Sequence, residues 1–309
     1  LICCIPIVDV MAMDPNLVRG ILSNIIGLAI LLSTAWPLDL VSYATLAVCI
    51  NWLVFFAHGL PQDSEKFFDA TGSLTYLFLV SMVVFRTGIQ SLRQALNPLL
   101  VTIWCLRLGT FLYARILRDG KDERFTELKK NKLRFLGVWT IQSLWCFLVT
   151  LPVLIVVSAG GCSSNPGLFD AVGWAIWLSG FIFEVVADKQ KEAFRSDPSN
   201  KTRFITSGLW AYSRHPNYFG EICMWIGICV SGSSCFSGSQ WLGWLSPVIT
   251  TLLLTKVSGV PLVEAKGQKT WGDQPEYQWY MEHTPCIVPA LLSRPPAFPG
   301  PDGYRAIKS

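Results

Sequence analysis

The sequence predicts an all-α protein, a polytopic integral membrane helical bundle with about seven to eight transmembrane helices. Three observations support this class. Of the 309 residues, 51% are hydrophobic and only 15% are charged, whereas soluble domains carry about 25% charged residues. The mean hydropathy is +0.42. Thirteen Trp and eighteen Phe supply aromatic side chains of the kind that gather at membrane interfaces.

Apolar runs divide the chain into spans that can be taken in order. Each run is near the length with which a helix crosses about 30 Å of hydrocarbon. Arg86 interrupts the third run, which leaves seven spans as the alternative to eight. The runs cover residues 17–36, 38–60, 72–90, 95–117, 136–158, 168–187, 217–235 and 240–262.

The connecting segments differ in charge in a way that agrees with eight spans. Segment 118–135 has seven Lys or Arg and segment 188–207 has five, whereas segments 160–167 and 231–239 have no charged residue. With eight spans, all the basic segments fall on one side of the membrane. By the positive-inside rule this is the cytosolic side or its organellar equivalent. We expect the endoplasmic reticulum membrane, with a mitochondrial or plastid membrane as the alternative.

Several function classes find no support. The net charge of +4 comes without a Lys/Arg stretch with interleaved aromatic residues, so we expect no nucleic-acid partner. The ten Cys include no CxxC pair, and we predict no metal site. Cys162 and Cys235 fall in the two uncharged loops, where a disulfide between them is one alternative. Because GxGxxG and GxxxxGK[ST] motifs are absent, side chains would have to hold any nucleotide.

Polar residues gather at the end of the sixth predicted span, in "FEVVADKQKEAFR". In a helix, Glu184, Asp188, Lys191 and Arg195 share one face at i, i+4, i+7 and i+11. This face is either a row of ion pairs at the membrane interface or the polar wall of a cofactor cavity. The cations Arg195, Lys201 and Arg203 lie within nine residues of one another. They could bind a pyrophosphate or lie near lipid headgroups.

A turn then leads into the seventh predicted span, in "GLWAYSRHPNYFGE". Asn217 and Glu221 are four residues apart, so they share a helix face just inside the membrane. Polar residues at that depth are typical of functional sites. This pair suggests recognition of an amide such as a nicotinamide carboxamide. His215 is either a proton donor or, more in keeping with its place before Pro216, a structural histidine.

These residues resemble a known superfamily. "GLWAYSRHPNYFGE" is similar to the RHPNYxGE/D signature of membrane steroid 5-alpha-reductase-like enzymes and sterol reductases. "KVSGVPLVE…WG…PEYQWYMEHTPCIVP" resembles the C-terminal signature of the same branch. The resemblance covers about residues 100 to 289. Isoprenylcysteine and phospholipid N-methyltransferases share the shorter pattern RHP-x-Y-x-G.

The resemblance implies bound NADPH and assigns residues to its site. The chain then divides into N-terminal helices on the substrate side (1–94), a reductase-like domain with the cofactor cavity (95–289) and an irregular tail (290–309). In these enzymes a substrate-activating acid follows a Gln-Glu pair, which this sequence lacks, so Glu65 and Asp69 in "LPQDSEKFFDATGS" are the nearest catalytic candidates. The predicted cofactor-binding residues are Asp188, Arg195, Arg203, Asn217, Glu221, Arg115, Arg118, Tyr212 and Lys201.

The implied function is an NADPH-dependent reduction of an activated C=C bond in a lipophilic, sterol- or prenyl-like substrate that enters from the membrane lipids. Hydride would reach the β-carbon of an enone while a donor stabilises the developing enolate. One alternative is a membrane methyltransferase that uses S-adenosylmethionine, a cofactor without phosphates. Another is a reductase-like accessory subunit of a larger membrane complex.

Overall fold

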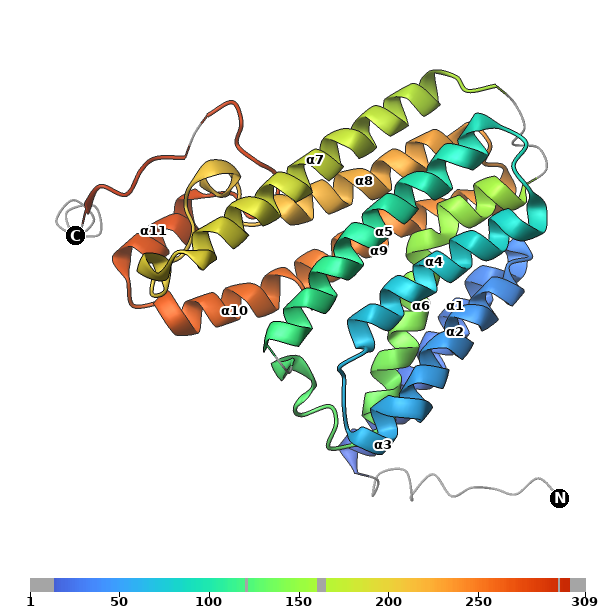
Figure 1. Cartoon of the computed structure of the whole chain (residues 1–309), viewed down its shortest axis with the longest axis horizontal. Helices are drawn as coiled ribbons and strands as arrows, with labels where there is room; N and C mark the ends of the chain where they lie inside the picture. Colours follow the sequence, from blue (N-terminus) through green and yellow to red (C-terminus); the bar gives the residue numbers. More distant parts are fainter. Residues whose placement is uncertain (1–13, 120–121, 160–164, 294, 301–309) are drawn as a thin grey trace. The chain divides into compact units, whose positions relative to one another are not determined.

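The computed structural model describes residues 14–119, 122–159, 165–293 and 295–300. These residues form helices joined by turns, and no strand occurs among them (Figure 1). Seven helical stretches in this part of the chain are long and apolar enough to cross a membrane, which confirms the predicted all-α, multi-pass class. They are Pro15–Leu38, Val41–Gln62, Phe68–Thr87, Leu92–Ala114, Lys132–Ser158, Leu168–Ser196 and Gly238–Trp271.

The predicted run at 217–235 also forms a helix, α8 (Pro216–Ser233). It is not among the seven stretches, because Asn217 and Glu221 in its first two turns lower its hydropathy. By length and composition, the described residues therefore give seven candidate spans, the lower of the two numbers that the sequence predicts.

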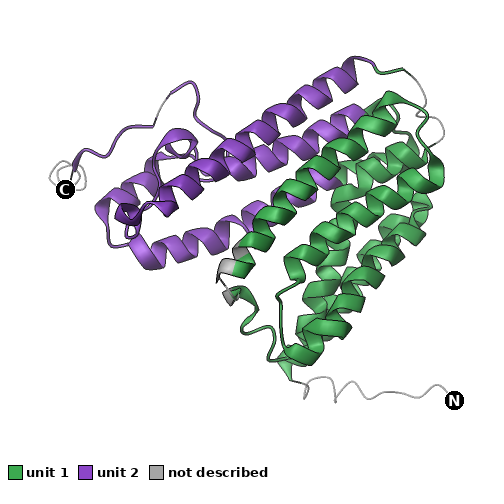
Figure 2. Ribbon diagram, viewed as in Figure 1, with its two compact units in different colours: residues 1–166, 232–245 green, residues 167–231, 246–309 purple. Residues whose placement is uncertain are grey.

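The chain folds into two compact units, shown in Figure 2. Unit 1 comprises Leu1–Pro166 and Gly232–Leu245, and unit 2 comprises Gly167–Ser231 and Ser246–Ser309. These units are defined by packing alone. The domain boundaries expected from the sequence, at residues 94 and 289, divide the chain by function, and they stay a prediction.

Unit 1 is organised around α6 (Lys132–Ser158). This helix has no charged residue after Arg134, and α1, α2, α4 and α5 all pack against it. A helix that is apolar on all sides is expected in the centre of a bundle, and most side chains of α6 are buried. The other elements of unit 1 are α1 (Pro15–Ala35), η2 (Trp36–Leu38), α2 (Val41–Val54), η3 (Phe55–Gly59), α3 (Leu60–Gln62), α4 (Phe68–Thr87), α5 (Leu92–Asp119), η4 (Glu123–Phe125) and η8 (Gly238–Trp244).

Unit 2 contains the polar segment that the sequence singles out. Its long helix α7 (Leu168–Ser196) continues well past residue 187, where the predicted span ends. All four residues of the predicted polar face, from Glu184 to Arg195, are therefore helical. The remaining elements are η6 (Pro198–Asn200), η7 (Gly208–Ala211), α8, α9 (Leu245–Leu252), η9 (Leu253–Val257), α10 (Val260–Trp271) and α11 (Pro275–His283).

Two pairs of glycines bring α7 and α8 into close antiparallel contact. A Cβ on Gly180 would lie 2.5 Å from the carbonyl oxygen of Gly220, and one on Gly173 would lie 2.5 Å from that of Gly227. Within each helix the two glycines are seven residues apart, so they face the same side. Small residues allow helix backbones in membranes to approach closely. This contact sets the backbone of α8 at Gly220 directly against that of α7 at Glu184.

Candidate functional site

The first feature of the candidate site is a hydrogen bond between α7 and α8. Nδ2 of Asn217 donates to Oδ1 of Asp188, over 3.2 Å. The glycine contact at Gly180 and Gly220, about two turns from Asp188 on α7 and one turn from Asn217 on α8, places these two side chains within reach of each other. Both residues are predicted cofactor contacts, and their hydrogen bond to each other is a finding of the structure.

The amide oxygen of Asn217, Oδ1, remains available as a hydrogen-bond acceptor. Its Oδ1 is buried and accepts no hydrogen bond from the described residues. Because Nδ2 already donates to a carboxylate, rotating the amide by 180° would place two oxygen atoms against each other. The orientation of the amide is therefore fixed, and Oδ1 is a buried acceptor for an N–H or O–H donor.

A tryptophan supports the polar face of α7 further along the helix. Nζ of Lys191 lies 4.5 Å from the centre of the Trp210 ring, a cation–π contact. Nε1 of Trp210 donates to the carbonyl oxygen of Ala187, over 3.0 Å. The turn before Trp210 needs glycine, because Gly208 has a φ of +61° and a Cβ there would meet the side chain of Gln190 at 2.5 Å. The 3-10 turn η7 is thereby held against α7.

Arg214 forms a clamp that holds the C-terminal segment. Its Nε donates to Oε1 of Glu264 on α10 over 2.9 Å, and its Nη1 donates to the carbonyl oxygens of Met281 and Thr284. The backbone continues this connection, since the N–H groups of Arg214 and His215 donate to the carbonyl oxygens of residues 285 and 286. The Arg and His of the RHP pattern thus tie α8 to α10 and α11 in this chain.

His215 is part of the same network. Its side chain is only 4% exposed, its Nε2 lies 3.0 Å from Oε1 of Glu264, and its ring stacks on Tyr218. Burial lowers the pKa of His215, and the nearby cations Lys191 and Arg214 lower it further, against the opposing effect of the Glu264 carboxylate. These contacts favour the interpretation of His215 as a structural histidine over its interpretation as a proton donor.

His215, Glu264 and Cys286 form the cluster that comes nearest to a metal site among the described residues. Their ligand atoms all lie within 4.8 Å of one another. However, the guanidinium of Arg214 already bonds to the carboxylate oxygen that a metal would use. A second cation there would be repelled, so the donor set does not fit a metal ion.

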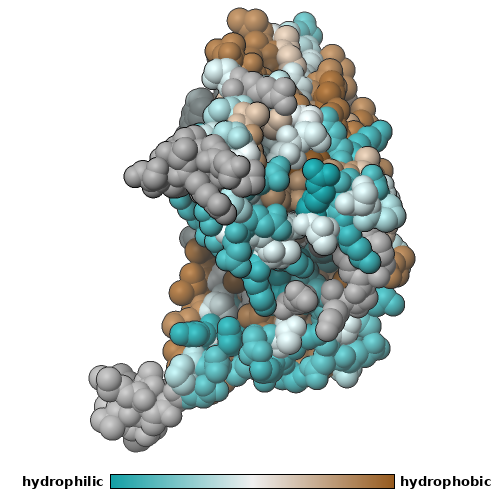
Figure 3. Space-filling view, turned by 90° about the vertical axis from the view of Figure 1, so that its left-hand side faces the viewer, coloured by the Kyte–Doolittle hydropathy of each residue, from teal (hydrophilic) through white to brown (hydrophobic). Residues whose placement is uncertain are grey.

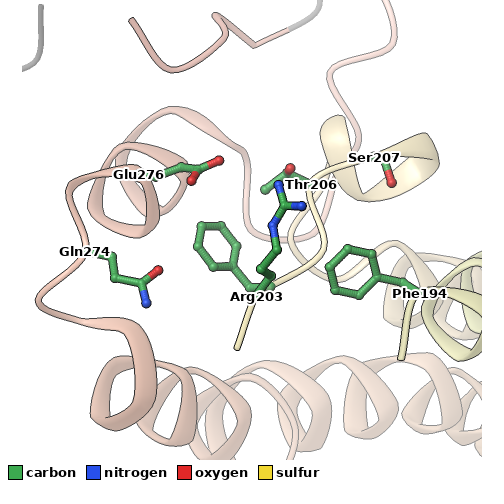
Figure 4. Close-up of a pocket in the computed structure, with 7 residues that line it drawn as sticks. Phe194, Arg203, Thr206, Ser207, Gln274 and Glu276 are labelled. Atoms are coloured by element: carbon green, nitrogen blue, oxygen red, sulfur yellow. The ribbon is translucent and has the colours of Figure 1, made fainter. Parts of the chain in front are cut away.

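A pocket of about 230 Å³ lies at the polar end of unit 2. Figure 4 shows the guanidinium of Arg203 pointing toward Thr206, with Gln274 and Glu276 on one side of the pocket and Phe194 on the other. Phe204 also lines it and packs edge-on against Tyr277 at 5.0 Å. Figure 3, which looks onto the side where α10 and α11 lie, shows hydrophilic side chains gathered there.

The other predicted cofactor residues lie in several places. Glu221 is half-buried, one turn beyond Asn217 on α8, while Arg195 and Lys201 are exposed. Tyr212 follows η7 and is half-buried, and its carbonyl oxygen accepts a hydrogen bond from Ala290. Within this set, Asp188 and Asn217 are in direct contact through their hydrogen bond. Arg115 and Arg118 belong to α5 of unit 1, and their side chains lie outside the described residues.

The two catalytic candidates both lie in unit 1. Glu65 is 5% exposed, and its carboxylate accepts hydrogen bonds from the Asp122 N–H, over 2.8 Å, and from Nζ of Lys129, over 2.6 Å. Burial raises the pKa of Glu65, but these two donors outweigh it and leave the pKa below its usual value. A carboxylate held in this way is a poor proton donor. Asp69 lies in the first turn of α4 and is half-buried. The catalytic assignment of both stays a prediction.

Sequence reasoning missed the role of Arg214. Its partners include two main-chain carbonyl groups that lie 67 and 70 positions away, which leave no side-chain signal. The sequence offered two hints. One was an arginine beside a turn, and the other was an acidic residue, Glu264, where a later predicted span ends.

Cys235 is disulfide-bonded. Since Cys162 lies outside the described residues, the pairing of these two cysteines stays a prediction.

Comparison with known proteins gives one broad match and two partial ones. The model of a family described as "Protein of unknown function (DUF1295)" matches residues 55–284. An uncharacterized protein of Schizosaccharomyces pombe is 25% identical over 185 residues, which are 51% of this chain and 53% of the relative. A "Probable O-methyltransferase" of Ustilaginoidea virens is 36% identical over 61 residues, 20% of this chain and 21% of the relative. The chain thus spans about half the length of the first relative and about a fifth of the second. No solved structure matches significantly.

Proposed function

The chain belongs to the family described as "Protein of unknown function (DUF1295)", and from this premise we propose that it is a membrane reductase of the steroid 5-alpha-reductase-like kind. It uses NADPH to reduce an activated C=C bond in a lipophilic, sterol- or prenyl-like substrate. The substrate reaches it from the membrane lipids, and the endoplasmic reticulum is the membrane we assign. The sequence signature at 208–221 and the polar end of unit 2 support this proposal.

The observation that carries the proposal is the buried acceptor Asn217 Oδ1. It lies on α8 beside the Asp188 carboxylate, at the membrane end of a polar helix face. A carboxamide N–H would satisfy this oxygen, whereas a purely apolar ligand would leave it unpaired at a cost of about 1–3 kcal/mol. The residues at this position therefore fit the amide end of a nicotinamide cofactor.

The cations beyond the helix fit the phosphate end. Arg195, Lys201 and Arg203 are exposed at the polar end of unit 2, and Arg203 lines a pocket with hydroxyl and amide groups. Arginine holds phosphate oxygens through parallel hydrogen bonds. Glu276 in the same pocket opposes an anion, so we assign phosphate binding first to Arg195 and Arg203 together rather than to the pocket alone.

When bound, NADPH supplies the hydride. The chain contributes orientation, because the Asp188–Asn217 pair fixes one end of the ligand and the arginines fix the other. The Arg214 clamp keeps α10 and α11 against the same segment, which favours a closed, dry site. None of these tasks requires a proton from His215.

The experiment is NADPH binding by the detergent-purified protein, measured by calorimetry. We expect Asn217→Ala and Arg195→Ala to weaken binding at least about tenfold, since each removes one or more hydrogen bonds to the ligand. Lys189→Ala is the matched control, because Lys189 is exposed on the same helix. Equal binding by all four proteins, or no binding by folded wild type, would reject the proposal.

A second candidate function is an S-adenosylmethionine-dependent methyltransferase. The observation that favours it is the 61-residue similarity to a protein named as a probable O-methyltransferase. It leaves Arg195, Lys201 and Arg203 without a role, because that cofactor has no phosphates. Thermal unfolding with each cofactor separates the two, since the ligand that binds raises the midpoint. A midpoint raised by S-adenosylmethionine alone would favour the methyltransferase.

A further inference from the structure

Unit 1 contains a separate pocket, of about 320 Å³, which no step of the proposed function uses. It lies where η2, the last turn of α6 and the start of η8 meet. Oγ of Ser239 donates to the carbonyl oxygen of Pro37 over 3.0 Å and so holds η8 against η2. Trp36 and Asp39 are among its lining residues.

The charges around this pocket are negative. Asp39 is its one charged lining residue, and no described residue forms an ion pair with the Asp39 carboxylate. The helices α1 and α6 both end beside the pocket, and neither has a basic residue in its last turn. Their C-terminal carbonyl groups therefore add partial negative charge.

Two arginines contact residues that lie close in the sequence to the lining of the pocket. Nη1 of Arg86 donates to Oγ of Ser42, and the guanidinium lies over the Tyr43 ring. Arg93 is fully buried and contacts Sγ of Cys235 over 2.7 Å. Neither lines the pocket. The pocket thus offers negative charge without a protein cation to neutralise it.

Trp36 gives the pocket an aromatic wall at the membrane interface. The residue directly follows α1 and lies near the end of a 24-residue candidate span, and it is 79% exposed. Tryptophan at the end of a span lies at the depth of the lipid headgroups. Its ring face attracts cations, and aromatic faces recognise quaternary ammonium ligands such as choline.

We propose that this pocket binds an alkylammonium group. The Asp39 carboxylate and the two helix ends supply the charge, and the Trp36 ring supplies the face against which the methyl groups pack. Two sources offer this chemistry at a membrane surface, the headgroup of phosphatidylcholine and free choline. The proposal does not depend on the proposed reductase function.

The test is calorimetric binding to the full chain, purified in detergent, of three probes: dihexanoyl-phosphatidylcholine, dihexanoyl-phosphatidylglycerol and choline. We expect phosphatidylcholine to bind and phosphatidylglycerol, which lacks the ammonium group, not to bind. Asp39→Asn and Trp36→Leu should each weaken binding about fivefold or more, the effect of losing one cation contact. Asp273→Asn, at another exposed aspartate, should change nothing.

The substitutions are chosen so that folding does not obscure the result. Asp39 has a φ of +56°, which asparagine also tolerates, so Asp39→Asn keeps the backbone and removes only the charge. Trp36→Phe keeps a ring face and should retain more affinity than Trp36→Leu. Binding of choline as well as phosphatidylcholine supports a site for the free cation, and binding of phosphatidylcholine alone supports a headgroup site. Equal binding of phosphatidylglycerol, or unchanged binding by Asp39→Asn and Trp36→Leu, overturns the proposal.

Discussion

Asn217 on α8 donates a hydrogen bond to the carboxylate of Asp188 on α7, with Nδ2 3.2 Å from Oδ1. The two residues are 29 positions apart, and each is one to two helical turns from a glycine at the α7–α8 contact. This relationship fixes the orientation of a buried amide. The proposed nicotinamide site rests on this pair.

The first prediction concerns this pair. Asp188→Ala should lower the free energy of unfolding by about 1–3 kcal/mol, because it leaves the amide N–H of Asn217 without its acceptor. Thermal unfolding in detergent would measure the change. Lys189→Ala, on the exposed side of the same helix, should leave the midpoint unchanged. A midpoint for Asp188→Ala that equals that of wild type would show that the hydrogen bond contributes nothing to stability.

The second prediction concerns the close approach of α7 and α8. Gly220→Ala adds a methyl group 2.5 Å from the carbonyl oxygen of Gly180, so the helices must separate. Overpacking of this kind costs about 1–3 kcal/mol or more, and it should also disturb the Asp188–Asn217 pair. Size-exclusion chromatography and thermal unfolding would detect the loss.

Gly167→Ala is the matched control for this change, because a Cβ at Gly167 meets no atom within 4 Å. Its backbone has a φ of −125°, which alanine adopts without strain. If Gly220→Ala and Gly167→Ala unfold at the same temperature, the glycine contact is not what holds α7 and α8 together.

The sequence predicts the helical class and names Asp188 and Asn217 as candidate cofactor residues, but it does not predict their hydrogen bond to each other. The reasons are physical. Membrane spans follow from composition, and the polar face of α7 follows from helical periodicity, because both are local properties of the chain. The clamp of Arg214 is different, since it joins a side chain to carbonyl groups 67 and 70 residues away. Every residue has a main-chain carbonyl group, so the residue type does not show which of them will accept a hydrogen bond. The ion pair of Glu65 with Lys129 joins two loops 64 positions apart and was equally hidden.

The third prediction concerns pH. The pKa of His215 is lowered in the folded protein, chiefly by burial, whereas in the unfolded chain it lies near 6.5. Between these two values the unfolded state binds more protons, so stability falls as the pH drops below about 6.5. His215→Gln keeps a hydrogen-bond donor but cannot be protonated. We therefore expect a flatter profile of melting temperature between pH 7 and pH 5 in this variant.

His283 provides the comparison for this experiment. It is half-buried, and its Nδ1 hydrogen-bonds the carbonyl oxygen of Trp279. His283→Gln should keep the pH profile of the wild type. If His215→Gln also kept it, another group would have to be responsible for the loss of stability in acid.

The last prediction separates a structural from a catalytic Glu65. Glu65→Gln removes the charge that pairs with Lys129, and we expect it to destabilise unit 1 by about 1–3 kcal/mol at pH 7. Because the folded pKa of Glu65 lies below its unfolded value near 4.3, the carboxylate stabilises the protein above that value. This contribution is lost as the pH falls through the folded pKa, so wild type and Glu65→Gln should converge in acid.

Glu127→Gln is the control, since the ion pair of Glu127 with Lys130 is exposed at both side chains and should contribute less than about 0.5 kcal/mol. A structural Glu65 changes the melting temperature and leaves NADPH binding intact. A catalytic Glu65 leaves the melting temperature intact and removes turnover of an enone substrate. Measuring both quantities on the same preparation assigns the residue. We expect the structural outcome, because the hydrogen bonds from Lys129 and the Asp122 N–H favour the ionised carboxylate.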